Sequence, residues 1–79
     1  MPPSLTFATS RAGALQVEVY DVGGRRVRML VNDPNSPAGV HVLRLDDRGD
    51  DGARLGSGVF FYRIRSADGS SKGHFLIMK

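Results

Sequence analysis

The 79-residue sequence contains no cysteine, so a disulfide framework, a zinc–thiolate site and a thiol nucleophile are all excluded. Long hydrophobic runs are also missing. No apolar stretch exceeds four residues, as in Phe75 to Met78, whereas a transmembrane helix needs about 20. The start, Met1-Pro2-Pro3-Ser4, lacks the basic and apolar segments of a signal peptide. If the protein is exported, we expect the export signal on other sequence, or expect this domain to be an address read at a later step.

Size and charge narrow the class of protein further. A chain of 79 residues predicts one domain, 1–79, which buries only about 60% of its unfolded surface. The net charge is +3, but six of the eight acidic residues lie between Asp21 and Asp51, among the arginines. This mixed pattern favours neither a nucleic-acid partner nor membrane insertion.

Apolar and polar residues alternate with a period of two in six segments, as in strands that bury one face. In the second segment this places Glu18 on the solvent side, opposite Val17. Asp21–Gly24 predicts a hairpin turn with two glycines available for positive φ, Asp33–Gly39 a longer loop, and Ala67–Ser71 another turn. We therefore predict an all-β, antiparallel β-sandwich of six to seven short strands. The predicted strands are Ser4–Thr9, Leu15–Tyr20, Arg26–Val31, His41–Leu45, Phe60–Arg65 and His74–Met78.

Residues for catalysis do not form a recognisable set. His41 and His74 lie on different predicted strands, and His41 is expected to be a partly buried strand residue. Gly56-Ser57-Gly58 lacks the spacing of a nucleophile elbow, and Gly23-Gly24 is not followed by the helix of a phosphate-binding loop. We predict no catalytic residue, no cofactor and no metal, and hence no enzyme.

Two charged segments have alternative interpretations. The acidic segment Asp46–Gly52 has four carboxylates in six positions, which could hold calcium. The favoured interpretation is that these side chains bond backbone amides in turns. Arg26 and Arg28 are expected on one solvent-facing side, where they protect a strand edge. The alternative for this basic stripe is a docking surface for an acidic partner.

Four segments, in this order and at these separations, carry a resemblance to a known family. They are Val19–Val31 with its Tyr20-Asp21-Val22-Gly23-Gly24-Arg25-Arg26 core, Pro37–His41, Asp50–Arg63 with Gly56-Ser57-Gly58, and Phe75–Lys79. Together they resemble the C-terminal sorting domain of type IX secretion cargo, which is related to the immunoglobulin-like domain of the flagellar hook-capping protein. The chain departs from the family in starting just after the usual Asn-Pro-Phe-like segment, so that it lacks the N-terminal edge of the pattern. It also has Leu45 where a tryptophan is common.

The resemblance implies an immunoglobulin-like sandwich that directs a secreted bacterial protein through the periplasm to the cell surface or medium. Its partners would be proteins of the secretion machinery, and an N-terminal cargo domain would lie outside this chain. The residues implied in recognition are Tyr20, Asp21, Gly24, Arg25, Arg26, Gly56, Gly58 and Lys79. The main alternative is a structural immunoglobulin-like domain of a flagellar hook-cap-type or cell-surface assembly protein. A calcium-dependent adhesion module built on the acidic segment is a third possibility.

Overall fold

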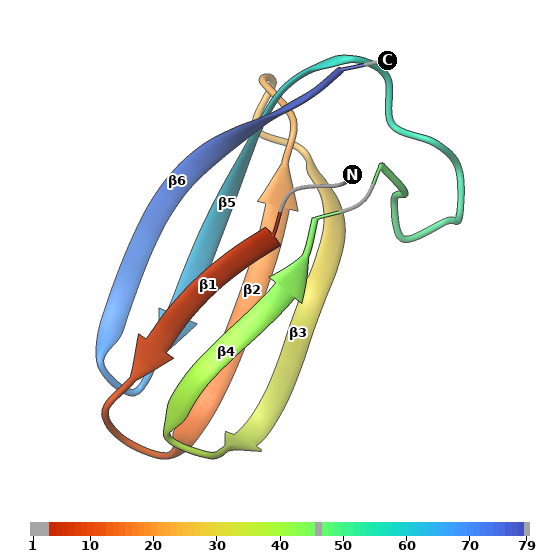
Figure 1. Ribbon diagram of the computed structural model, residues 1–79. Helices are drawn as coiled ribbons and strands as arrows, with labels where there is room; N and C mark the ends of the chain where they lie inside the picture. Colours follow the sequence, from red (N-terminus) through yellow and green to blue (C-terminus); the bar gives the residue numbers. More distant parts are fainter. Residues whose placement is uncertain (1–3, 46, 79) are drawn as a thin grey trace.

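The computed structural model describes residues 4–45 and 47–78, and within them the chain forms six strands and no helix (Figure 1). Strand order in the larger sheet is β3-β2-β5-β6, and β1 pairs with β4 in a second sheet. All pairs are antiparallel. The strands are β1 (Ser4–Thr9), β2 (Gly13–Tyr20), β3 (Arg26–Ser36), β4 (Gly39–Arg44), β5 (Gly58–Ser66) and β6 (Gly69–Ile77).

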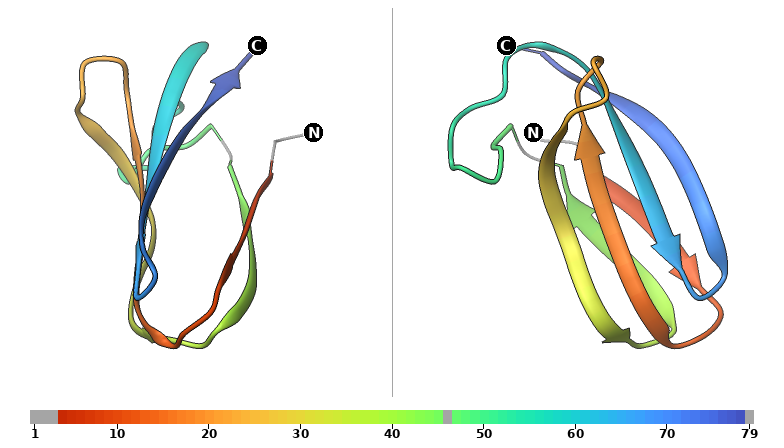
Figure 2. Two further views of the ribbon diagram at one scale, coloured as in Figure 1. Left: turned by 90° about the vertical axis from the view of Figure 1, so that its left-hand side faces the viewer. Right: turned by 180° about the vertical axis from the view of Figure 1, so that it is seen from behind.

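The two sheets face each other as a small sandwich, which confirms the predicted fold class. Figure 2 shows that they lie close at the end where β1 leads into β2, and diverge toward the end where β6 finishes. The two-stranded sheet therefore covers only part of the four-stranded one. At the diverging end, the inner face of the larger sheet is covered by its own side chains and by the segment that follows β4.

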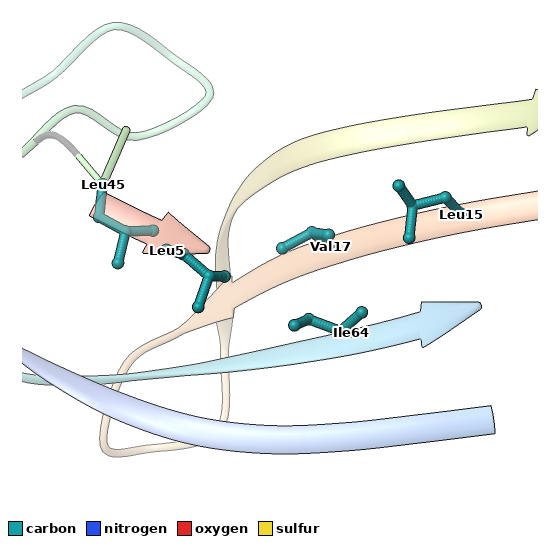
Figure 3. Packing of buried hydrophobic residues seen from close by; sticks show 5 residues of the cluster. All are labelled: Leu5, Leu15, Val17, Leu45 and Ile64. Atoms are coloured by element: carbon teal, nitrogen blue, oxygen red, sulfur yellow. The ribbon is translucent and has the colours of Figure 1, made fainter. Parts of the chain in front are cut away.

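The core forms where alternating residues of both sheets meet. Leu15 and Val17 of β2 are buried side by side, and Ile64 of the neighbouring strand β5 packs against them. Leu5 and Leu45 close the cluster from the smaller sheet and its end (Figure 3). A second cluster lies toward the diverging end and consists of Val19, Phe60 and Ile77, with Leu55 packed against it from the connecting segment.

Strand β3 is longer than the sequence predicts. The segment from Asp33 was expected to be a loop, yet β3 continues to Ser36, which pairs with Gly13 of β2. Pro34 is tolerated because β3 is at the edge of its sheet, where a missing N–H need not leave a partner strand unbonded. Proline is thus a weaker strand-breaking signal here than its usual behaviour suggests.

Register shifts in the β2–β3 pair also change which side chains share a face. The shifts lie between Val17 and Glu18 and again before Tyr20. Strict alternation is lost on β3, where Leu30 has no partner in β2 and packs against the core. The expected pairing of Arg26 with Arg28 on one face is therefore wrong: Arg26 reaches Glu18, whereas Arg28 donates to the carbonyl of Arg48.

Strand β6 begins at Gly69, five residues before the predicted start, because its pairing with β5 continues down to the Ser66–Gly69 pair. Within the strand, Gly73 is paired with Tyr62, and a Cβ at Gly73 would overlap the Tyr62 ring. The aromatic ring covers the position that the glycine leaves open. Glycine in this strand is therefore a packing requirement.

Val17 allows a direct test of the core. Its side chain is 0% exposed, whereas Val42 on β4 is 66% exposed. Val17→Ala is expected to lower the free energy of unfolding by about 2 kcal/mol, because the loss of two methyl groups leaves a cavity. Val42→Ala should change it by less than about 0.5 kcal/mol. Urea denaturation followed by circular dichroism measures both values, and equal losses would contradict this assignment of the core.

Candidate functional site

The most unusual residue of the larger sheet is Glu18, a buried carboxylate on the side facing away from the core. It follows Val17 in β2, so alternation directs its side chain to the outer face. The sequence predicts a solvated residue there, yet Glu18 is only 4% exposed. An acidic side chain is seldom buried to this degree unless other groups compensate its charge.

Four side chains on three strands provide that compensation. Arg65 Nη2 donates to Glu18 Oε1 at 2.6 Å, and the Tyr20 hydroxyl donates to Oε2 at 2.9 Å. Arg63 Nη2 lies 3.4 Å from Oε1 and donates to the Tyr20 oxygen at 3.0 Å. Arg26 Nη1 lies 3.5 Å from Oε2. We refer to these five residues as the Glu18 cluster.

Strand pairing places the members of the Glu18 cluster next to one another. Glu18 of β2 is directly opposite Arg63 of β5, and Arg65 is two residues further along the same face. Tyr20 pairs with Arg26 of β3, on the other side of β2. The sequence contains the alternation that turns these side chains outward. It does not show that β2 lies between β3 and β5, so the cluster was missed.

The electrostatics of the Glu18 cluster favour the ionised carboxylate. Burial by itself would raise the pKa of Glu18, but hydrogen bonds from Arg65 and Tyr20, with the nearby positive charges, lower it from 4.5 to about 2. The Arg63 guanidinium also lies over the Tyr20 ring, 5.5 Å from its centre. Three cationic side chains surround a single carboxylate, so the cluster as a whole is positive.

Beside the cluster, the β2–β3 hairpin contains most of the predicted recognition residues. Asp21 Oδ1 accepts hydrogen bonds from the backbone amides of Gly23 and Arg25, and its own N–H donates to the Arg25 carbonyl. Only Gly24 has the positive φ expected of both glycines, at 85°. The turn is thus held by a short network centred on Asp21.

An exposed apolar patch adjoins the hairpin on the same outer face. Val59 and Phe61 of β5 pair with Leu76 and His74 of β6, and the Phe61 and Leu76 side chains are 43% and 56% exposed. Because Phe61 also pairs with Tyr20, the patch borders the Glu18 cluster. We call Val59, Phe61 and Leu76 the apolar patch. A shallow groove between hairpin and β6 is lined by Tyr20, Val22, Phe61, Lys72 and Gly73.

Two further predicted recognition residues, Gly56 and Gly58, lie near the same end of the larger sheet. Gly56 just precedes β5, and Gly58 begins that strand and pairs with Ile77 near the end of β6. In Figure 1 the β2–β3 hairpin and the end of β6 lie at the same end of the molecule. Lys79 lies outside the described residues. The recognition role of all these residues remains a prediction.

Two carboxylates of the acidic segment, Asp50 and Asp51, bond backbone amides, as the favoured interpretation expects. Both carboxylate oxygens of Asp50 accept the backbone amide of Met29, at 3.0 and 3.2 Å, which attaches the segment to β3. Asp51 Oδ1 accepts the amide of Ala53, and Asp47 Oδ2 lies 3.9 Å from Arg54 Nη1. Asp46 lies outside the described residues. Within residues 4–45 and 47–78, no three His, Asp or Glu side chains gather to hold a metal ion.

The two histidines have different surroundings. His41 lies half-buried, as expected, with its ring stacked on Phe7 at 5.1 Å and its Nε2 atom 3.2 Å from the Thr9 hydroxyl. His74 is exposed on the outer face, with its ring tilted against Phe61. They lie on different sheets, so they do not form a joint site.

Comparison with known proteins found no matching family model, no matching curated protein and no matching solved structure. In the part of the chain that the structure describes, no helix is long and apolar enough to cross a membrane.

The compensation of Glu18 can be tested with an isosteric change. Glu18→Gln is expected to lower the free energy of unfolding by about 1–3 kcal/mol, because it removes the charge that three arginines share. Asp51→Asn is the matched control, since it makes the same change in charge at an exposed turn residue. It should cost less than about 0.5 kcal/mol. Urea denaturation at neutral pH measures both, and equal effects would count against the cluster.

Stability at acid pH gives a second test of the Glu18 cluster. Because folding lowers the pKa of Glu18 from 4.5 to about 2, its contribution is complete above pH 4.5 and is lost as the pH falls toward 2. The difference in unfolding free energy between wild type and Glu18→Gln should therefore shrink steadily over that range. Asp68, whose pKa is also lowered by bonds from Ser10, is present in both proteins and cancels. A difference that does not change with pH would contradict the assigned protonation.

Proposed function

We propose that the chain is a noncatalytic sorting module. It directs a secreted bacterial protein across the outer membrane to the cell surface or medium, and proteins of the secretion machinery recognise it after the cargo has reached the periplasm. It acts as a binding surface attached to a cargo domain, and the cargo carries the biochemical activity. The family resemblance of four ordered segments is the origin of this proposal.

One structural observation supports it most. The resemblance assigns recognition to the Tyr20–Arg26 hairpin and the Gly56–Gly58 turn, which are about thirty residues apart in the sequence. In the fold, Tyr20 pairs with Phe61 of β5, and Gly58 pairs with Ile77 of β6. The hairpin and the turn, which a partner would have to contact together, are thus connected through strand β5. Recognition by a shaped strand surface requires no catalytic residue.

A structural role in a cell-surface or hook-cap-type assembly is the alternative. The observation that favours it lies on the other sheet, where Val40 and Val42 of β4 are 72% and 66% exposed. Exposed β-branched residues on a two-stranded sheet are suited to packing against a neighbouring subunit. In that case the β1–β4 sheet would be the essential surface, and the hairpin would be dispensable.

A fusion experiment separates the two functions. Residues 1–79 are joined to the C-terminus of a periplasmic reporter in a bacterium with a working type IX system. We expect the reporter on the cell surface or in the medium, and we expect Arg25→Glu to reduce export several-fold by reversing charge in the exposed hairpin. Arg44→Glu on β4 is the matched control and should export normally. Fractionation and immunoblotting measure the distribution.

The contradicting outcomes are specific. A reporter that stays periplasmic, while an established sorting domain exports it in parallel, would exclude the sorting function. Normal export of the Arg25→Glu variant together with loss in the Arg44→Glu variant would assign recognition to the other sheet. Circular dichroism of each purified domain ensures that unfolding is not the cause.

A further inference from the structure

The outer face of the larger sheet combines positive charge and exposed apolar surface. Arg26, Arg63 and Arg65 surround Glu18, and Lys72 of β6 pairs with Arg63 from the other side. Four cationic side chains therefore share the face with one carboxylate, which leaves it strongly positive. The apolar patch continues directly from this region through Phe61, the neighbour of Arg63 on the same face. Lys72 and Leu76 belong neither to the core nor to the Glu18 cluster.

The arginines of this face are ordered before any ligand arrives. Each reaches Glu18 through a single terminal nitrogen, and their side chains are between 36% and 50% exposed. A guanidinium has five N–H donors, so Arg26 and Arg65 retain donors for an external anion, whereas Arg63 Nε is buried and its Nη2 already donates to Glu18 and Tyr20. Side chains that are already held in place lose less conformational entropy on binding.

Charge and hydrophobicity change along the strands in the same order. On β5 the outward residues run Arg65, Arg63, Phe61 and Val59, and on β6 their partners run Ser70, Lys72, His74 and Leu76. Outward residues on one strand are about 7 Å apart. An extended chain alongside β6 would thus meet Lys72, with Arg63 and Arg65 behind it on β5, over its first half, and His74 and Leu76 over its second.

The backbone of β6 is available to such a chain. Strand order β3-β2-β5-β6 makes β6 an edge, and its nine residues pair with β5 alone among the described strands. A free edge can bind an extended peptide as an added strand, with affinity from main-chain hydrogen bonds and specificity from alternate side chains.

We propose that the outer face of β5 and β6 binds an extended acidic segment of a partner protein, added along the edge of β6. Carboxylates of that segment lie against Lys72, with Arg63 adding positive charge from the next strand, and apolar side chains further along it lie against Leu76, beside Phe61. The inference rests on the proposed function in one respect, that a protein reads this surface, and it adds the chemistry of the segment. The free strand edge and the change from cations to apolar side chains along the two strands favour this partner over a nucleic acid or a lipid surface, because a peptide can add as a strand and carry both kinds of side chain.

The test uses two synthetic octapeptides and the purified 79-residue chain. Both peptides have threonine at alternate positions; the others are Glu, Glu, Leu and Leu in one peptide and Lys, Lys, Leu and Leu in the second. In an NMR titration we expect the acidic peptide to shift the amides of β5 and β6, with a Kd on the order of 0.1–1 mM. The lysine peptide should bind at least about tenfold more weakly.

Matched variants locate the binding surface. Lys72→Glu should weaken binding of the acidic peptide by about fivefold or more, while Arg44→Glu, the same reversal on the other sheet, should change it less than about twofold. Phe61→Ser should weaken binding similarly, and Val42→Ser should not. The hydrogen bonds and ion pairs of Glu18 described above involve none of these four residues, and all four side chains are exposed, so folding of the variants is expected.

Several results would overturn the inference. These are the absence of shifts on β5 and β6, equal binding of the lysine peptide, and equal losses for Lys72→Glu and Arg44→Glu. Tighter binding of a single-stranded oligonucleotide, or of vesicles containing anionic lipid, to the same residues would assign the face to that class instead. The reporter assay is independent: export by the wild-type domain without peptide binding rejects this inference alone, and peptide binding without export rejects the proposed function.

Discussion

The structure depends on a central strand, β2, that is buried on both faces. On the inner side Val17 is completely enclosed by the two sheets, and on the outer side Glu18 is nearly as inaccessible. Burial of Val17 is stabilised by the hydrophobic effect. Burial of Glu18 is tolerated because arginines from both neighbouring strands compensate its charge. A domain of 79 residues has little surface to bury, and this one buries side chains on both faces of β2.

This arrangement links folding to the character of the outer surface. Glu18 holds three arginines in position, and they would otherwise be flexible surface side chains. The ordered cations adjoin Phe61, whose ring remains exposed. The proposed partner would meet charge, exposed apolar side chains and a free strand edge on this one face. The same side chains that stabilise the sheet would thus define what it binds.

Six strands and the hairpin at Asp21–Gly24 could be predicted from alternation and turn residues, because these are local properties. The end of β3 could not be predicted. Pro34 signals a loop in a central strand and is harmless at an edge, and only the strand order reveals which applies. The early start of β6 was missed for a related reason, since Gly73 is acceptable only where the Tyr62 ring covers it.

For the candidate site, the sequence by itself determined the faces: a period of two sends Glu18, Arg63 and Arg65 outward and Val17 inward, whatever the topology. It also determined the hairpin residues around Asp21. The tertiary structure alone decided which outward residues become neighbours, because pairing of β2 with both β3 and β5 joins residues up to 47 positions apart. Side-chain direction follows from the backbone of one strand, whereas a charge cluster requires several strands in a definite order and register.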